Sequence, residues 1–320
     1  MRAIQVNEFG GPEVLRPADL PAPEAGPGEV LIDVEAADVI YLDTMLRQGW
    51  GGEYFPVEPP YVPGGGGAGW VVAVGEGVDP GWVGRRVAAR CSAGYAEKVV
   101  TTVEDIVAVP GGVGSAEAAA LVHDGVTALV LLRAGAIARG ERVLVAAAAG
   151  GAGSLVVQLA HDAGAQLVAA ARGDGKLALA RELGARHGAD YSEPGWPDRV
   201  RASLGGRGVD VAFDGAGGPL GLQVFETVAD GGRFVTYGTS DGFTEIDPDV
   251  ARRRRIRVTN ALEGMPGKAE VRELLSTALD LVAQGRIRPV IGATFPLERA
   301  ADAHASLAER TTVGKSLLFV

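Results

Sequence analysis

The sequence predicts an α/β protein of two domains, a doubly wound parallel sheet and a smaller, mostly antiparallel β domain. Two observations lead to this prediction. Short strands broken by Gly and Pro fill residues 1–121, whereas strand and helix patterns alternate from residue 142 onward. Strand and helix segments near the end of the chain are expected to return to the first domain. The predicted domains are therefore 1–121 with 287–320, and 122–286.

The first domain is expected to form a small barrel-like sheet, because its strands are short and evenly spaced. The segments with strand character are Met1–Val6, Glu29–Ala36, Gly69–Gly75, Gly84–Ala89, Ala96–Val100 and Ile106–Pro110. From Ser115 the period changes to that of a helix, and Ser115 is a plausible N-cap. A second helix is expected over Val126–Leu132.

The second domain is expected to hold a parallel sheet, because buried apolar strands alternate with helices. Its predicted strands are Val143–Ala148, Leu167–Ala171, Val209–Asp214, Arg233–Tyr237 and Ile256–Asn260. Its predicted helices are Ser154–Ala163, Lys176–Leu183, Pro197–Leu204, Leu220–Val228 and Ala269–Gln284. The returning segments are a strand at Val290–Phe295, a helix at Glu298–Glu309 and a strand at Lys315–Val320.

The first of these strands runs into a loop made only of Ala and Gly. It reads Ala147-Ala-Ala-Gly150-Gly151-Ala152-Gly153 and is followed by a predicted helix. Unpaired N–H groups and the helix dipole at such a helix start favour a pyrophosphate, and small residues let its oxygens approach the backbone. The strand before the loop and the helix after it supply the context that this glycine pattern needs, so the loop predicts a dinucleotide site.

The end of the next strand selects the cofactor. A site for NAD normally places Asp or Glu there to accept from the ribose 2′-OH. This chain has Arg172, and Lys176 follows after a glycine turn. Two cations suit a 2′-phosphate, so we expect NADPH. Asp174 is the competing signal, and a solvated helix start is the alternative interpretation of the two cations.

Composition excludes several other function classes. The 320 residues carry a net charge of −10, which argues against nucleic acid or an anionic membrane surface as the main partner. The single cysteine fits a reducing cytosol. The chain shows no signal peptide ahead of its first strand and no apolar run of membrane-spanning length. A cytoplasmic protein is expected.

Several motifs together resemble the medium-chain dehydrogenase/reductase superfamily and, within it, the zinc-free quinone oxidoreductases of the zeta-crystallin-like group. The resemblance covers nearly the whole chain and implies a GroES-like catalytic domain, a Rossmann nucleotide-binding domain and a homodimer. Its motifs are Gly10–Leu15, Asp43-Thr44-x-x-Arg47-x-Gly49, Pro60–Gly64, Gly125–Ala128, the Ala/Gly loop, Lys176–Ala185, Ala303-His304-x-x-Leu307 and Gly314-Lys315.

The metal ligands of the zinc-containing relatives are missing. Those proteins carry Cys where this chain has Ile40, and His and Glu where it has Gly65 and Gly66. The four-cysteine structural zinc loop is absent as well. Because a catalytic zinc needs three protein ligands, alcohol oxidation is disfavoured, whereas hydride delivery to an electrophilic quinone or enone remains feasible. Ile40 also replaces the Asn of quinone reductases, which leaves the substrate open.

The resemblance also implies site residues. Tyr54 and Tyr41 are candidate catalytic phenols, and Ile40, Trp50 and His123 are candidate substrate contacts, with ordinary packing as the alternative for each aromatic and histidine side chain. The candidate cofactor contacts are Thr127, Ala147, Gly150, Gly151, Ala152, Gly153, Arg172, Lys176, Tyr191, Tyr237, Gly238, Thr239 and Ser240.

The expected activity is hydride transfer from NADPH to a quinone without zinc. An enone or enoyl reductase of secondary metabolism is the alternative enzyme. A protein that binds NADPH without turnover, as a sensor or structural partner, is the alternative from another class. A homodimer is expected to pair through the strand Ile256–Asn260.

Overall fold

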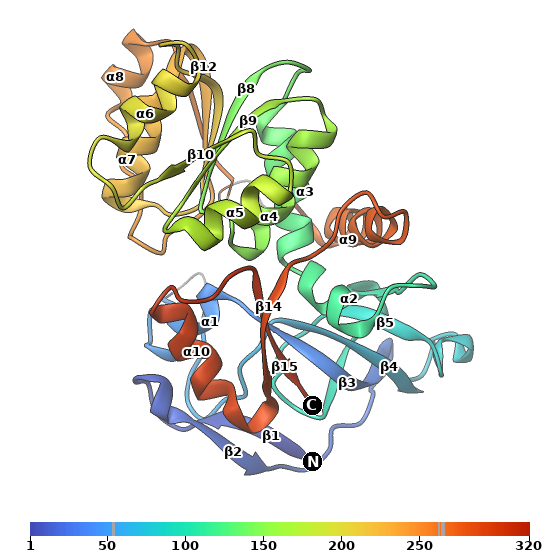
Figure 1. Cartoon of the computed structure of the whole chain (residues 1–320). Helices are drawn as coiled ribbons and strands as arrows, with labels where there is room; N and C mark the ends of the chain where they lie inside the picture. Colours follow the sequence, from blue (N-terminus) through green and yellow to red (C-terminus); the bar gives the residue numbers. More distant parts are fainter. Residues whose placement is uncertain (53–54, 262, 264–265) are drawn as a thin grey trace. The chain divides into compact units, whose positions relative to one another are not determined.

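The computed structural model describes residues 1–52, 55–261, 263 and 266–320, and the chain divides into two compact units (Figure 1). Unit 1 comprises Met1–Val126 with Gly267–Val320, and unit 2 comprises Thr127–Pro266. The sequence predicts the helix at 269–284 in the second domain, but its contacts place it in unit 1. An amphipathic pattern shows that one helix face is buried, not which sheet buries it.

Unit 1 is built on a sheet with the strand order β14-β15-β3-β4-β5-β7, and β6 also pairs with β3. The pairing of β14 with β15 is parallel, whereas β3 pairs antiparallel with β15, β4 and β6. The strands are β3 (Glu29–Val39), β4 (Gly66–Val74), β5 (Arg86–Arg90), β6 (Lys98–Thr102), β7 (Ile106–Ala108), β14 (Ile291–Pro296) and β15 (Lys315–Phe319).

The remaining elements of unit 1 cover and close this sheet. A hairpin pairs β1 (Arg2–Val6) with β2 (Leu15–Asp19) in antiparallel register. The core gathers the buried side chains of alternate strand positions, Val30 and Ile32 of β3 among them. The helices are α1 (Tyr41–Arg47), α2 (Ser115–Leu121), α9 (Lys268–Ala283) and α10 (Ala300–Ala308), with 3₁₀ turns at Pro12–Val14, Pro80–Trp82, Val103–Asp105 and Leu297–Arg299.

Unit 2 is a parallel sheet with the order β10-β9-β8-β11-β12-β13. Figure 1 shows α6, α7 and α8 on one side of these strands and α3 and α4 on the other. The strands are β8 (Arg142–Ala146), β9 (Gln166–Ala171), β10 (His187–Asp190), β11 (Val209–Asp214), β12 (Val228–Thr236) and β13 (Arg257–Asn260). The helices are α3 (Asp124–Gly135), α4 (Gly151–Asp162), α5 (Asp174–Glu182), α6 (Trp196–Ser203), α7 (Gly218–Thr227) and α8 (Pro248–Arg253).

The strand order of unit 2 locates its binding edge. The chain moves outward from β8 through β9 to β10, then returns to β11 on the other side of β8. This reversal between β8 and β11 is a topological switch point, where open parallel sheets bind ligands beyond the carboxyl ends of their strands. The doubly wound sheet predicted from the sequence is confirmed.

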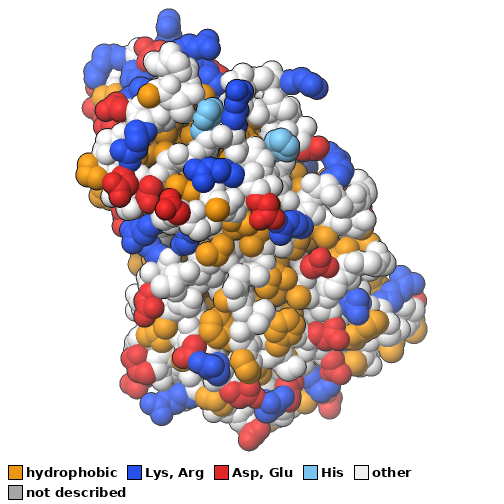
Figure 2. Space-filling view, in the orientation of Figure 1, with side chains coloured by type: hydrophobic (Ala, Val, Ile, Leu, Met, Phe, Trp, Pro, Cys, Tyr) orange, Lys and Arg blue, Asp and Glu red, His pale blue; other side chains and the backbone are white. Residues whose placement is uncertain are grey.

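The surface carries charges of both signs. On the face shown in Figure 2, Lys and Arg side chains are interspersed with Asp and Glu. Among the described residues, no single helix has the length and apolar character to cross a membrane, although the bent pair α2 and α3 passes that test when taken together.

Candidate functional site

The phosphate loop lies at the carboxyl end of β8, beside the switch point. Ala147 has a φ of +57°, and its carbonyl accepts from Gly150 N–H at 2.9 Å. Helix α4 then begins at Gly151, three residues before the predicted start at Ser154. Gly151, Ala152 and Gly153 therefore form its first turn, whose N–H groups have no acceptor within the helix.

Glycine is required in this turn by a close backbone contact. A Cβ on Gly153 would lie 2.3 Å from the Ala147 carbonyl oxygen, far inside van der Waals distance, whereas one on Gly150 would lie 3.3 Å from it. The helix start thus packs directly on the loop. Residues Ala147, Gly150, Gly151 and Ala152 remain partly accessible. These features fit a pyrophosphate held by backbone N–H groups and the dipole of a 12-residue helix.

The cationic turn follows β9, the neighbour of β8 in the sheet. Arg172 is exposed immediately after the last residue of β9, and Gly173 turns the chain with a φ of +80°. Helix α5 begins at Asp174, so Lys176 lies in its first turn, where it is partly buried. The two cations that the sequence predicts at a 2′-phosphate site therefore lie at the same sheet edge as the phosphate loop.

Asp190, at the end of β10, holds the cationic turn in place. Its Oδ2 accepts from Gly173 N–H at 2.7 Å, and its Oδ1 accepts from Ser192 N–H at 2.8 Å and Ser192 Oγ at 2.6 Å. Burial raises the pKa of Asp190, but these hydrogen bonds and the charge of Arg172 lower it further than burial raises it. With three donors bound, this carboxylate holds the turn that follows Arg172.

Asp190 was not among the residues singled out in the sequence. Its strand, His187–Asp190, is short and lacks an apolar run, so periodicity gave no signal for it. Tyr191, a predicted cofactor contact, follows directly and donates its N–H to Ala171 O at 3.3 Å. The main chain of Tyr191 therefore lies beside the end of β9.

The predicted contacts Tyr237–Ser240 leave the end of β12 and pack on the segment that follows β11. Tyr237 N–H donates to Asp214 O at 2.9 Å, and Ser240 Oγ donates to Ala216 O at 3.1 Å. A Cβ on Gly238 would lie 1.9 Å from Gly215 O. The Tyr237 hydroxyl is 3.5 Å from Ala146 O, at the end of β8. Thr239 lies within the same segment.

Asp214 organises this segment and was missed from the sequence. It is fully buried, and its Oδ1 accepts from the N–H groups of Ala216 and Gly217, both at 3.0 Å. Its Oδ2 accepts from Thr244 Oγ1 at 2.7 Å. An acidic residue at the end of a buried strand, followed by Gly-Ala-Gly-Gly, is the signal that could have revealed it.

The predicted substrate-side residues lie in unit 1. Ile40 is the N-cap of α1, and its N–H donates to Asp43 Oδ2 at 3.0 Å. Tyr41 begins α1 and is 37% exposed, while Trp50 follows α1 and is 46% exposed. Tyr54 lies outside the described residues. Thr127, a predicted cofactor contact, is partly buried on α3 at the start of unit 2.

His123 lies on the turn between α2 and α3 and contacts a buried ionic cluster. Its Nδ1 is 2.7 Å from Oδ2 of Asp38, which is fully buried on β3. The Lys315 ammonium lies 3.3 Å from Asp38 Oδ2 and 3.3 Å from Asp124 Oδ2. Burial raises the pKa of Asp38, but the charges of His123 and Lys315 hold it well below its usual range.

A second buried polar network lies at the start of α1. Tyr95 hydroxyl donates to Asp43 Oδ2 at 2.9 Å and lies 3.1 Å from His304 Nε2. Burial raises the pKa of Asp43 to about 6 and lowers that of His304 to about 3. Because Asp43 also accepts from Ile40 N–H, this network fixes the N-terminus of α1.

The described residues contain no group of three or more His, Cys, Asp and Glu side chains placed to hold a metal ion. Ile40, Gly65 and Gly66, at the positions of the family's zinc ligands, offer no donor side chain.

Known proteins match the whole chain. The family model for the alcohol dehydrogenase GroES-like domain matches residues 26–134, and that for the zinc-binding dehydrogenase matches residues 183–318. The quinone oxidoreductase of Pseudomonas aeruginosa is 34% identical, with 99% of each chain covered. The chain belongs to the zinc-free quinone oxidoreductase group of the medium-chain dehydrogenases/reductases. The resemblance predicted from its motifs is confirmed.

Two further members of this superfamily bear on cofactor and substrate. The quinone oxidoreductase of Escherichia coli, solved in complex with NADPH, superposes with a TM-score of 0.92 at 27% identity, with both chains fully covered. The 2-haloacrylate reductase of a Burkholderia species is 30% identical over 99% of this chain and 98% of its own. Quinone oxidoreductases and a 2-haloacrylate reductase are thus both among the relatives.

Proposed function

We propose that the protein is an NADPH-dependent, zinc-independent quinone oxidoreductase. The observation that supports it best is the pairing of the phosphate loop with the cationic turn at one edge of the unit 2 sheet. Gly153 and Ala147 bring the helix start against the loop, and Arg172 follows the neighbouring strand. Family membership and the NADPH complex of the Escherichia coli relative point to the same cofactor and acceptor class.

The residues fit NADPH by charge as well as by shape. The first-turn N–H groups of α4 would hold the pyrophosphate, and Arg172 with Lys176 would hold the 2′-phosphate. The turn formed by Asp190 keeps Arg172 at the edge of the sheet. Bound NADPH supplies a hydride, and the protein's task is to bind, orient and exclude water.

The acceptor must already be electrophilic, because the described residues offer no metal-binding cluster to polarise it. A quinone meets this condition, since one carbonyl oxygen gains charge directly as the hydride arrives. Side-chain donors must then stabilise that oxygen. The sequence predicts the phenol groups of Tyr41 and Tyr54 as hydrogen-bond donors to this oxygen.

A turnover assay with purified protein tests the proposal. NADPH oxidation is followed with 1,4-benzoquinone as acceptor and compared with NADH at the same concentrations. We expect turnover with NADPH and a lower kcat/KM with NADH. Tight NADPH binding without turnover across a panel of quinones and enones would instead support a cofactor-binding protein without catalysis.

A carbon–carbon double bond reductase is the second candidate, favoured by the similarity to the 2-haloacrylate reductase. The same hydride delivered to the β-carbon of an activated alkene gives this reaction. Ile40 replaces the Asn of the quinone reductase pattern, which makes this position apolar. A higher kcat/KM for an α,β-unsaturated ketone than for benzoquinone would support the double-bond reductase over the quinone oxidoreductase.

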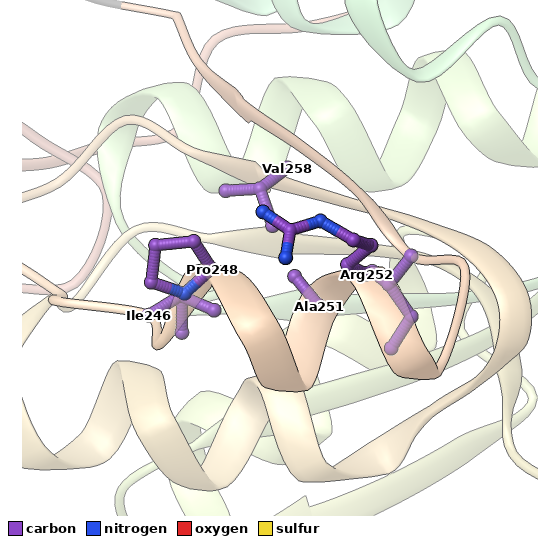
Figure 3. A pocket seen from close by; sticks show the side chains of 6 residues that line it. Ile246, Pro248, Ala251, Arg252 and Val258 are labelled. Atoms are coloured by element: carbon purple, nitrogen blue, oxygen red, sulfur yellow. The ribbon is translucent and has the colours of Figure 1, made fainter.

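We also propose that the protein forms a homodimer through β13. This strand ends the strand order of the unit 2 sheet, next to β12, and an edge strand can pair with a strand of a second chain. Beside it lies a pocket of about 410 Å³ lined by side chains of α8 and β13, including Ala251, Arg252 and Val258 (Figure 3). Antiparallel pairing of two β13 strands about a twofold axis would join two sheets and cover this apolar surface.

A cytoplasmic location completes the proposal. Cys91 is the only cysteine, and burial raises the pKa of its thiol to about 12. A single unreactive thiol suits a reducing compartment. Fractionation of the source cells with an antibody to the protein tests this location.

A further inference from the structure

The ionic cluster of unit 1 contains more negative than positive charge unless His123 is protonated. Asp38 and Asp124 are the carboxylates, and the ammonium of Lys315 lies within 3.3 Å of both. Lys315 is 4% exposed and Asp38 is fully buried, so solvent screens this cluster weakly. A proton on His123, whose Nδ1 is 2.7 Å from Asp38 Oδ2, would balance the charges.

The two ring nitrogens of His123 have different surroundings. Nδ1 faces Asp38, whereas Nε2 has no hydrogen-bond partner among the described residues, and the side chain is 19% exposed. His304 differs, because its Nδ1 is sealed from solvent. A carboxylate that orients Nδ1 and leaves Nε2 accessible is the arrangement that proton-transfer histidines require.

The glycine run after residue 63 makes room for this ring. A Cβ on Gly65 would lie 3.2 Å from His123 Cε1, and one on Gly66 would lie 3.1 Å from it. The Gly66 Cβ would also lie 2.6 Å from Val122 Cγ1. Side chains at 65 and 66 would therefore displace the turn that carries His123. The imidazole lies over the backbone positions at which zinc-containing relatives place metal ligands.

We propose that His123 is the proton donor of the reaction and that Asp38 is its positioning residue. This proposal rests on the proposed function and names the acid that protonates the reduced quinone after hydride transfer. The hydride adds to the quinone with its two electrons, forms the first of the two new bonds to hydrogen, and leaves one oxygen as an anion. The Nε2–H bond then breaks, an O–H bond forms on the hydroquinone, and solvent returns a proton to Nε2.

The charged groups around His123 set its pH behaviour. They are Asp38 from β3, Asp124 from α3, Lys315 from β15 and, through its charge, Asp43 from α1. Because a donor must hold its proton, kcat with a quinone is expected to fall as pH rises. Asp38→Asn removes the anion nearest the ring, so the midpoint of that fall should move to lower pH.

A binding experiment on the protein without cofactor provides a readout other than activity. The probe is 4-nitrophenol, whose phenol and phenolate forms absorb at different wavelengths. We expect the wild type to bind it with the phenolate band, as an anion beside a protonated ring. His123→Asn keeps a donor near Asp38 but has no atom at Nε2, so its phenolate band should disappear. His161→Asn, on the surface of α4, is the matched control.

Turnover then separates this inference from the proposed function. His123→Asn should lower kcat with benzoquinone about 100-fold and remove the pH dependence, while the Kd for NADPH changes less than twofold. Unchanged kcat, pH profile and phenolate band in this variant would overturn the role of His123 and leave the function standing. A wild type that binds nitrophenolate but reduces no quinone would overturn the function instead. Thermal melting of each variant confirms that it is folded, and Asp38→Asn gives an independent second test.

Discussion

Replacement of Arg172 by Ala should weaken NADPH binding and leave NADH binding unchanged. Arg172 is exposed at the end of β9, so its attraction to a phosphate acts through nearly aqueous surroundings. At 4 Å in water two unit charges attract by about 1 kcal/mol, and a doubly charged 2′-phosphate doubles that to about 2 kcal/mol. A loss of this size corresponds to about a 30-fold rise in the Kd for NADPH. The neutral 2′-hydroxyl of NADH gains nothing from the guanidinium.

Isothermal titration at about 0.1 M salt measures both constants. Arg186→Ala is the matched control, because Arg186 is also exposed but precedes β10, at the opposite edge of the same sheet. Its NADPH affinity should match that of the wild type. The effect of Arg172→Ala should shrink as salt rises, since the charge is exposed. Equal weakening of NADPH and NADH, or equal effects of the two substitutions, would refute the assignment of the cationic turn.

Three further predictions concern the loop, the buried cluster and the sheet edge. Gly153→Ala should raise the Kd for NADPH at least tenfold in the same titration, because the added Cβ must displace the phosphate loop. Gly267→Ala is the control and should leave this Kd unchanged, because the added Cβ enters open space. Lys315→Met should cost about 3–5 kcal/mol in urea unfolding at pH 7, because Asp38 loses its buried cation. In the wild type the pKa of Asp38 is lower in the folded than in the unfolded protein, so its ionisation stabilises the fold at pH values above the usual carboxyl pKa of 3.8. This stabilisation is lost as pH falls below 3.8. The difference in unfolding free energy between Lys315→Met and the wild type should therefore shrink in acid. Val258→Asp places a charge on the edge strand, where Val258 is 41% exposed, and light scattering should then give half the mass of the wild type.

Local patterns predicted most of unit 2. The run Val143–Val145 is fully buried in β8, as an apolar stretch before a glycine loop indicates. The loop composition and Arg172 predict the phosphate-binding and cofactor-selecting positions without any long-range information. The start of α4 differed from the prediction because two of the three residues of its first turn are glycines, which have low helix propensity, so only the tertiary packing of Gly153 on Ala147 reveals it.

The features of the site that the sequence did not predict depend on contacts between segments far apart in the chain. Asp38, His123 and Lys315 lie far apart in the chain, and although His123 is a predicted substrate contact, nothing in the sequence predicts that the three side chains meet. Only the antiparallel pairing of β15 with β3 brings the lysine beside Asp38. Asp190 escaped notice for a related reason, because its hydrogen bonds to the Gly173 turn depend on the pairing of β10 with β9.

The position of β15 in the sheet also determines when β3 can complete its pairing during translation. Residues Ala36–Val39 of β3 pair with β15, which is translated only after all of unit 2. Unit 2 therefore has every strand it needs while this part of β3 still exposes open backbone groups. For that interval the nascent chain carries an unsatisfied strand edge, which is the kind of surface that chaperones shield and that favours aggregation.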